Sequence, residues 1–169
     1  MNIVVLERNS VGPDISVDCF HELGNVTIYK NTVTVEEVAE RVKDADIIVA
    51  NKSPMREESL KDATHLKMIC EFATGYDNCD LEYCKKRGIR VTNVVDYCTA
   101  MVAQHTFTLA LALSQKLPHY DNYVKSGAYS AQDRFSNFDA TFYELEGKTW
   151  GIVGMGNIGR RGAKIATAF

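Results

Sequence analysis

The sequence predicts an α/β protein built on a parallel β-sheet, followed by the first part of a second α/β unit. Short apolar runs alternate with segments of helical periodicity, and no hairpin turn joins consecutive runs. This pattern is typical of a parallel sheet covered by helices. Residues 154–159 read G-x-G-x-x-G directly after an apolar run. A strand, a glycine turn and a helix in that order are what a dinucleotide site requires.

The strands of the first unit are predicted from the apolar runs. The first run is continuously apolar, as in strands that are covered on both faces. The expected strands are Ile3–Leu6, Val26–Tyr29, Ile47–Ala50, Lys67–Cys70 and Ile89–Thr92.

Helix signals separate these strands. Thr34 and Glu37 have the spacing of a capping box, and apolar residues follow at i, i+3, i+4 and i+7 from Val35. Another helix begins at Asp80 and has basic residues in its last turn before Gly88, which agrees with the helix dipole and with a glycine C-cap. The helices expected between the strands cover residues 13–23, 34–42, 57–62 and 80–86.

Residues 1–98 are therefore interpreted as one small α/β domain, and residues 99–169 as the start of another. A long helix is expected from Thr99 to about Lys116. Its second half is almost entirely apolar, so burial on most sides is expected. A further helix is predicted over 119–125, and residues 128–144 are expected to be an irregular surface segment.

A buried strand is predicted over Thr149–Val153, leading into the glycine turn. The first glycine allows a tight turn, the second lets the backbone approach a pyrophosphate, and the third lets helix and strand pack closely. Free N–H groups at the helix start would then hold the phosphates. A tight turn without a ligand is the alternative. The residues expected to bind the cofactor here are Gly154, Gly156, Asn157, Ile158 and Gly159.

Composition argues against several classes of partner and site. The formal net charge is −3, which argues against nucleic acid or an anionic membrane as a partner. No apolar run is long enough to span a membrane, and residues 1–7 are interpreted as a strand and not as a signal peptide. The five cysteines and four histidines show no disulfide or metal-ligand spacing, so no metal site is predicted and reduced thiols in the cytoplasm are expected.

Several segments together resemble the D-isomer-specific 2-hydroxyacid dehydrogenases. They occur in the order and at the spacing of that family, which makes them more specific than the glycine motif alone. Small departures are Cys79, where the family usually has Ile or Val, and Val95-Asp96, which replaces a common Pro-Gly. The matching segments are 66–69, 74–80, 87–93, 102–106 and 145–149 with the glycine turn.

The resemblance implies a flavodoxin-like substrate domain over 1–98 and the truncated start of an NAD-binding Rossmann domain over 99–169. It implies NAD(H)-dependent interconversion of a 2-keto acid and a D-2-hydroxy acid, with NADP left open and a homodimer expected. Hydroxypyruvate and glycerate are the preferred pair. The family's catalytic Arg, Glu or Asp, and His lie beyond the glycine turn. No catalytic residue is therefore assigned, and the chain is expected to be inactive by itself.

Substrate residues are expected where strands end, because ligands bind there in parallel sheets. The resemblance implies that backbone N–H groups at Thr74 and Gly75 hold the substrate carboxylate and that Thr74 also contacts the cofactor. Asn51 and Lys52 also follow a strand end, and Lys52 would add a positive charge. An ordinary turn and a solvated lysine are the alternatives.

Val102 and Thr106 lie one turn apart on the long predicted helix and therefore share one face. The resemblance implies that this face meets the nicotinamide side of the cofactor, with the Thr106 hydroxyl available to it. Core packing of Val102 is the alternative.

Two other functions are compatible with the sequence. One is a binding protein of corepressor type that senses NAD(H) without turnover. The other is a truncated-gene remnant, in which the strand Thr149–Val153 would lack neighbours and Trp150 would be exposed or misplaced. In that case residues 99–169 would pack loosely.

Overall fold

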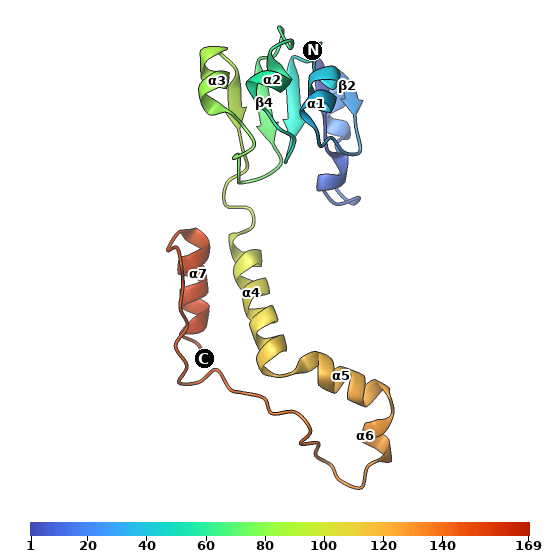
Figure 1. Cartoon of the computed structure of the whole chain (residues 1–169), viewed down its shortest axis with the longest axis vertical. Coiled ribbons are helices and arrows are strands. Elements are labelled where there is room, and N and C mark those ends of the chain that lie inside the picture. The colour runs from blue at the N-terminus through green and yellow to red at the C-terminus, as the bar shows by residue number, and fades with distance from the viewer. The chain divides into compact units, whose positions relative to one another are not determined.

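The computed structural model describes all residues from Met1 to Phe169. The chain divides into two compact units, Met1–Val95 and Asp96–Phe169. The first unit contains every β-strand, and the second is built from helices and loops (Figure 1). None of the helices combines the length and the apolar character that crossing a membrane would require.

The first unit contains a sheet of five parallel strands in the order β2-β1-β3-β4-β5. This is the doubly wound order of flavodoxin-like folds, whose strand order reverses between β1 and β3. The strand predictions are confirmed to within about one residue. The strands are β1 (Asn2–Val5), β2 (Asn25–Ile28), β3 (Ile47–Ala50), β4 (Met68–Glu71) and β5 (Arg90–Thr92).

Three helices cover one face of the sheet: α1 (Val35–Arg41), α2 (Glu57–Leu60) and α3 (Leu81–Lys86). The main hydrophobic core lies between these helices and the strands, because the apolar residues of both are buried there. On the other face, the ring of Phe20 stacks on that of Phe72 with centroids 6.2 Å apart.

Helices α1 and α3 begin, and α3 ends, where the capping residues in the sequence predict. The Thr34 hydroxyl accepts a hydrogen bond from the Glu37 amide, and the Glu37 carboxylate accepts one from the Thr34 amide, which completes the capping box. Asp80 accepts from the Tyr83 amide at 2.9 Å. Gly88 has φ +71°, the left-handed conformation of a glycine C-cap.

The helix expected over residues 13–23 is wrong. Only a short 3₁₀ turn, Asp18–Glu22, forms in this segment, after another at Arg8–Ser10. Ile15 and Leu23 are 52% and 58% exposed, so the apolar periodicity has no core face to bury. The Arg8 guanidinium instead donates to the Val11, Gly12 and Ile15 carbonyls and holds this loop.

The second unit contains α4 (Thr99–Ser114), α5 (Leu117–Lys125), α6 (Ala128–Ala131) and α7 (Asn157–Ala166). Helix α4 packs against α7. The expectation that α4 is buried on most sides is wrong, because α7 covers one side only. Ala103 and Phe107 are its buried residues, whereas Leu113 is 73% exposed.

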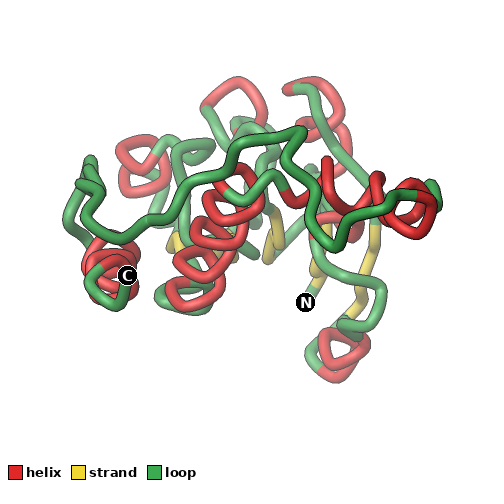
Figure 2. Tube along the Cα trace, turned by 90° about the horizontal axis from the view of Figure 1, so that it is seen from below, coloured by secondary structure: helices red, strands yellow, loops and turns green.

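The strand expected over Thr149–Val153 does not form, because the second unit contains no other strand to pair with its backbone. Val153 is fully exposed. Trp150 is not left exposed, however, since its ring stacks on Phe107. The chain between α6 and α7 is a long loop (Figure 2), so the irregular segment expected over 128–144 is confirmed apart from α6.

Candidate functional site

The ends of β1, β3 and β4 meet at the carboxyl edge of the sheet, since all three strands are parallel neighbours. Glu7 follows β1 and Asn51-Lys52 follow β3, while Thr74-Gly75 lie in the loop after β4. The parallel topology therefore brings both predicted substrate loops to one edge of the first unit.

Glu7 was not predicted from the sequence, yet it organises the loop after β3. Its side chain is 6% exposed. The carboxylate accepts hydrogen bonds from the amides of Asn51 at 2.7 Å, Lys52 at 2.9 Å and Ser53 at 3.1 Å. Successive backbone N–H groups of this kind form a concave anion site, and here the chain's own carboxylate fills it. The Asn51 and Lys52 amides are therefore engaged, and only their side chains remain for a ligand.

In the loop after β4, in contrast, several consecutive backbone amides have no acceptor within the chain. The Thr74 hydroxyl donates to the Val94 carbonyl at 2.8 Å, and the Asn93 side chain donates to the Thr74 carbonyl at 2.8 Å. The amides of Thr74, Gly75 and Tyr76 donate no hydrogen bond within the chain, and all three residues are exposed. These N–H groups are free to bind an anion.

Glu71, at the end of β4, lies beneath this loop and is 2% exposed. Its Oε1 accepts from Asn78 Nδ2 at 3.0 Å and from the Cys79 thiol at 3.0 Å, whereas Oε2 is buried without a partner. Burial raises the pKa of Glu71, which the charge of Glu7 also favours, while the bonds from Cys79 and Asn78 and the charge of Lys52 oppose the rise. Burial also raises the pKa of Cys79, so its thiol stays protonated and donates.

The glycine turn of the second unit has the local conformation that its glycines permit, although the strand expected before it does not form. Gly154 has φ +93°, which L side chains rarely adopt. A Cβ on Gly159 would overlap the carbonyl oxygen of Gly154. The first helical bond of α7 runs from the Arg160 amide to the Gly156 carbonyl at 2.9 Å. The amides of Asn157, Ile158 and Gly159 donate to no acceptor in the chain and remain free.

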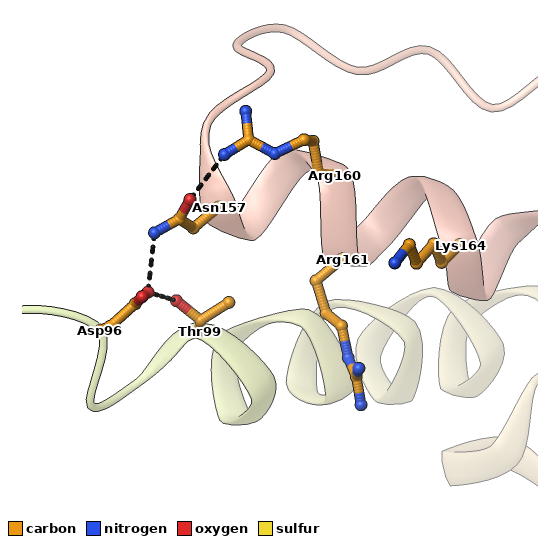
Figure 3. Close-up of a pocket in the computed structure, with 6 residues that line it drawn as sticks. All are labelled: Asp96, Thr99, Asn157, Arg160, Arg161 and Lys164. Carbon is orange, nitrogen blue, oxygen red and sulfur yellow. Dashed lines mark hydrogen bonds between the residues drawn. The ribbon is translucent and has the colours of Figure 1, made fainter.

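The side chain of Asn157 lies between Asp96 and Arg160 (Figure 3). It donates to Asp96 Oδ1 at 2.8 Å and accepts from Arg160 at 2.6 Å. Bonds from the Thr99 hydroxyl and from Asn157 lower the pKa of Asp96. Asp96 has φ +63°, the left-handed region in which glycine is favoured. Arg161 and Lys164 complete the lining of this shallow pocket.

Val102 and Thr106 lie on α4 and line one shallow pocket together with His105. The Thr106 hydroxyl donates to the Val102 carbonyl at 2.8 Å, so its lone pairs remain available as acceptors. Val102 is 39% exposed and is therefore not a core residue of the second unit. Of the residues expected to bind the cofactor, Thr74 lies in the first unit, and the glycine turn, Val102 and Thr106 lie in the second.

Comparison with known proteins places this geometry in a family. Residues 3–163 match the family described as D-isomer specific 2-hydroxyacid dehydrogenase, catalytic domain. The chain is 34% identical to a hydroxypyruvate reductase of Blautia hydrogenotrophica over 171 aligned positions, covering 99% of this chain and 53% of that protein. It is 37% identical to a glycerate dehydrogenase of Methylorubrum extorquens, covering 98% and 52%.

A solved structure agrees with these matches. A D-lactate dehydrogenase from Aquifex aeolicus, complexed with NAD and lactic acid, superposes with a TM-score of 0.77 at 30% identity and covers 99% of this chain and 48% of that one. The chain spans about half the length of the relatives it matches. It belongs to the family of D-isomer-specific 2-hydroxyacid dehydrogenases.

Proposed function

We propose that the protein takes part in the NAD(H)-dependent interconversion of a 2-keto acid and a D-2-hydroxy acid. The observation that carries this proposal is the set of free, exposed amides at Thr74, Gly75 and Tyr76 on the carboxyl edge of a parallel sheet. Backbone N–H groups in this position suit the carboxylate of a small acid. The side chains of Asn51 and Lys52, on the adjacent loop, would add a polar group and a positive charge.

The glycine turn suits the pyrophosphate of a nicotinamide dinucleotide. Three free amides at the start of α7 would hold the phosphates, and nothing lies within 4 Å of a Cβ built on Gly156, so a ligand has room to approach. Val102 and Thr106 are proposed to face the nicotinamide side. When bound, the cofactor supplies or accepts the hydride at the carbonyl carbon. NAD is the cofactor we favour, and NADP is the alternative.

Hydroxypyruvate and glycerate are the substrate pair that we favour, because the relatives described above include a hydroxypyruvate reductase and a glycerate dehydrogenase. We propose that residues 1–98 form the substrate domain and that residues 99–169 form the first part of the nucleotide domain. The proposal assigns no residue of this chain to proton transfer. A cytoplasmic homodimer is part of the same proposal.

Two measurements test this function. The first is NMR titration of the chain, in which hydroxypyruvate, pyruvate and glyoxylate should shift the amide signals of Thr74 to Tyr76, and NADH should shift those of Asn157 to Gly159. The second is the oxidation of NADH by the full-length gene product with each keto acid, because the 169-residue chain is expected to be inactive by itself. The absence of both ligand shifts, together with no oxidation of NADH with any of the three acids, would overturn the proposal.

A further inference from the structure

A continuous polar network lies beneath the two loops of the candidate substrate edge. Three of its side chains are almost completely buried: Glu7 is 6% exposed, Glu71 is 2% exposed and Ser53 is fully buried. The network runs from Glu7 through the loop at 51–53 to Asn78, and from Asn78 to Glu71. Buried polar groups that are bonded to one another in this way fix the position of the backbone they hold.

Glu7 fixes the loop after β3. Its carboxylate accepts from three consecutive amides, and the Ser53 hydroxyl donates to the Thr32 carbonyl at 2.9 Å. Hydrogen bonds to an ionised acceptor are stronger than those between neutral groups. The backbone that carries Lys52 is therefore held from beneath, while the Lys52 side chain is exposed.

Asn78 joins this loop to the loop after β4. Its Nδ2 donates to the Ser53 carbonyl at 2.9 Å and to Glu71 Oε1 at 3.0 Å, which uses both protons of the amide group. The main chains also pair at this point, because the Met55 amide donates to the Asn78 carbonyl at 2.9 Å and the Asp80 amide donates to the Met55 carbonyl at 2.8 Å. The side chain of Asn78 and this main-chain pairing together join the two loops.

The backbone amides at the carboxyl edge of the sheet are of two kinds, engaged and free. Those at 51–53 are occupied by Glu7, whereas those at Thr74, Gly75 and Tyr76 have no acceptor in the chain. An incoming carboxylate therefore has only one of the two amide groups open to it. The charge of Lys52 acts at this edge, since it opposes the rise in the pKa of the nearby Glu71 that burial causes.

We propose that Glu7 and Asn78 are positioning residues of the substrate site. They hold the loop of Lys52 and the loop of Thr74-Gly75 at a fixed separation, so that the ammonium of one and the amides of the other act on the same carboxylate. Neither side chain touches the substrate. This inference rests on the proposed function, because it concerns the binding of the keto acid by these loops.

The first test removes the carboxylate of Glu7 and supplies a carboxylate from solution instead. In the 169-residue chain with Glu7→Ala, hydrogen exchange at the amides of Asn51, Lys52 and Ser53 should accelerate at least tenfold. Acetate should restore slow exchange and the wild-type amide shifts, whereas neutral acetamide should not. A role in packing alone predicts equal rescue by both molecules. Equal rescue, or unchanged exchange in the variant, would overturn the role of Glu7.

The second test uses Asn78, which is only partly buried, so that it does not depend on the folding of the Glu7 variant. Glyoxylate is titrated while the Thr74 and Gly75 amide shifts are followed. Asn78→Ala should weaken glyoxylate binding at least tenfold with the other sheet signals unchanged. Asn31→Ala is the matched control, because the Asn31 side chain is exposed, and its affinity should equal that of the wild type.

The outcomes separate the two proposals. If glyoxylate shifts these amides in the wild type and Asn78→Ala binds it equally well, the positioning role is wrong and the proposed function stands. If none of glyoxylate, pyruvate and hydroxypyruvate shifts them in the wild type, the positioning role is wrong. The proposed function fails as well if NADH shifts no amide and is not oxidised with any of the three acids.

Discussion

The indole ring of Trp150 stacks on the ring of Phe107, with centroids 4.4 Å apart and planes inclined by 17°. Phe169 extends the stack on Phe107, with centroids 5.8 Å apart. These rings attach the start of the glycine-turn segment and the C-terminal end of the chain to α4. Because the sequence contains one tryptophan, its fluorescence reports on the second unit alone.

Removing the stacked partner should expose this tryptophan. We expect Phe107→Ala to shift the Trp150 emission to longer wavelength and to destabilise the second unit, because the pair contributes about 0.5–1.5 kcal/mol beyond its burial. Urea unfolding followed by tryptophan fluorescence measures both effects. Leu113→Ala is the control, since Leu113 is 73% exposed. An unchanged emission in Phe107→Ala would show that the stack does not form in solution.

The capping box of α1 should contribute to the stability of the first unit. Thr34→Ala removes the acceptor of the Glu37 amide, and the expected loss is about 1 kcal/mol of unfolding free energy. Thr34→Ser keeps a hydroxyl at this position and should recover most of the loss. The measurement is urea unfolding followed by far-ultraviolet circular dichroism. Equal stability of the alanine and serine variants would contradict a capping role.

Two carboxyl groups should give the stability of the first unit opposite dependences on pH. Burial raises the pKa of Glu71 in the folded chain, so its stabilising contribution is fully present below the unfolded pKa and is lost as the pH rises through the folded pKa. Hydrogen bonds from Lys67 and from the Asn2 amide lower the pKa of Asp46. Its contribution is present above the unfolded pKa and is lost as the pH falls through the folded pKa.

Urea unfolding of the wild type, Glu71→Gln and Asp46→Asn between pH 3 and pH 8 tests these signs. As the pH falls, the wild type should gain stability relative to Glu71→Gln and lose stability relative to Asp46→Asn. If the direction of one of the two pKa shifts were wrong, both differences in unfolding free energy would change in the same direction with pH.

The third glycine of the turn should be required for cofactor binding. A Cβ at Gly159 would overlap the Gly154 carbonyl oxygen, whereas nothing lies within 4 Å of a Cβ at Gly162 in the same helix. We expect Gly159→Ala to weaken NADH binding at least tenfold, or about 1.4 kcal/mol. Gly162→Ala should bind as the wild type does, with α7 stabilised by up to about 1 kcal/mol. Titration of NADH fluorescence compares the two variants, and equal affinities would remove the steric argument.

The sequence predicts the first unit well because its signals are local. Four-residue apolar runs, the capping residues Thr34 and Asp80, and the glycine at position 88 each determine a short segment by contacts within that segment. Alternation of strands and helices then permits few arrangements besides a parallel sheet. The residues of the glycine turn were found for the same reason, since Gly154 and Gly159 meet steric needs of one short turn.

The wrong and the missed predictions have a common cause. Each concerns residues whose structure depends on contacts with distant parts of the chain. Thr149–Val153 has the composition of a strand, but a strand needs a neighbouring backbone, and none is present. The segment 13–23 has a helical period without a surface to pack against. Glu7 was missed because its partners lie 44–46 positions away along the chain. The only sequence signal for it is an acidic residue immediately after a buried strand.

The Glu7 carboxylate beneath the loop at 51–53 also affects the free energy of ligand binding. A keto acid has few atoms, and even the best small ligands gain at most about 1.5 kcal/mol per non-hydrogen atom. Little of the binding free energy of such a ligand is available to order two loops. Because Glu7 and Asn78 hold those loops in place before the ligand arrives, the conformational entropy of the site is lost during folding, and the interactions of the ligand are available for affinity.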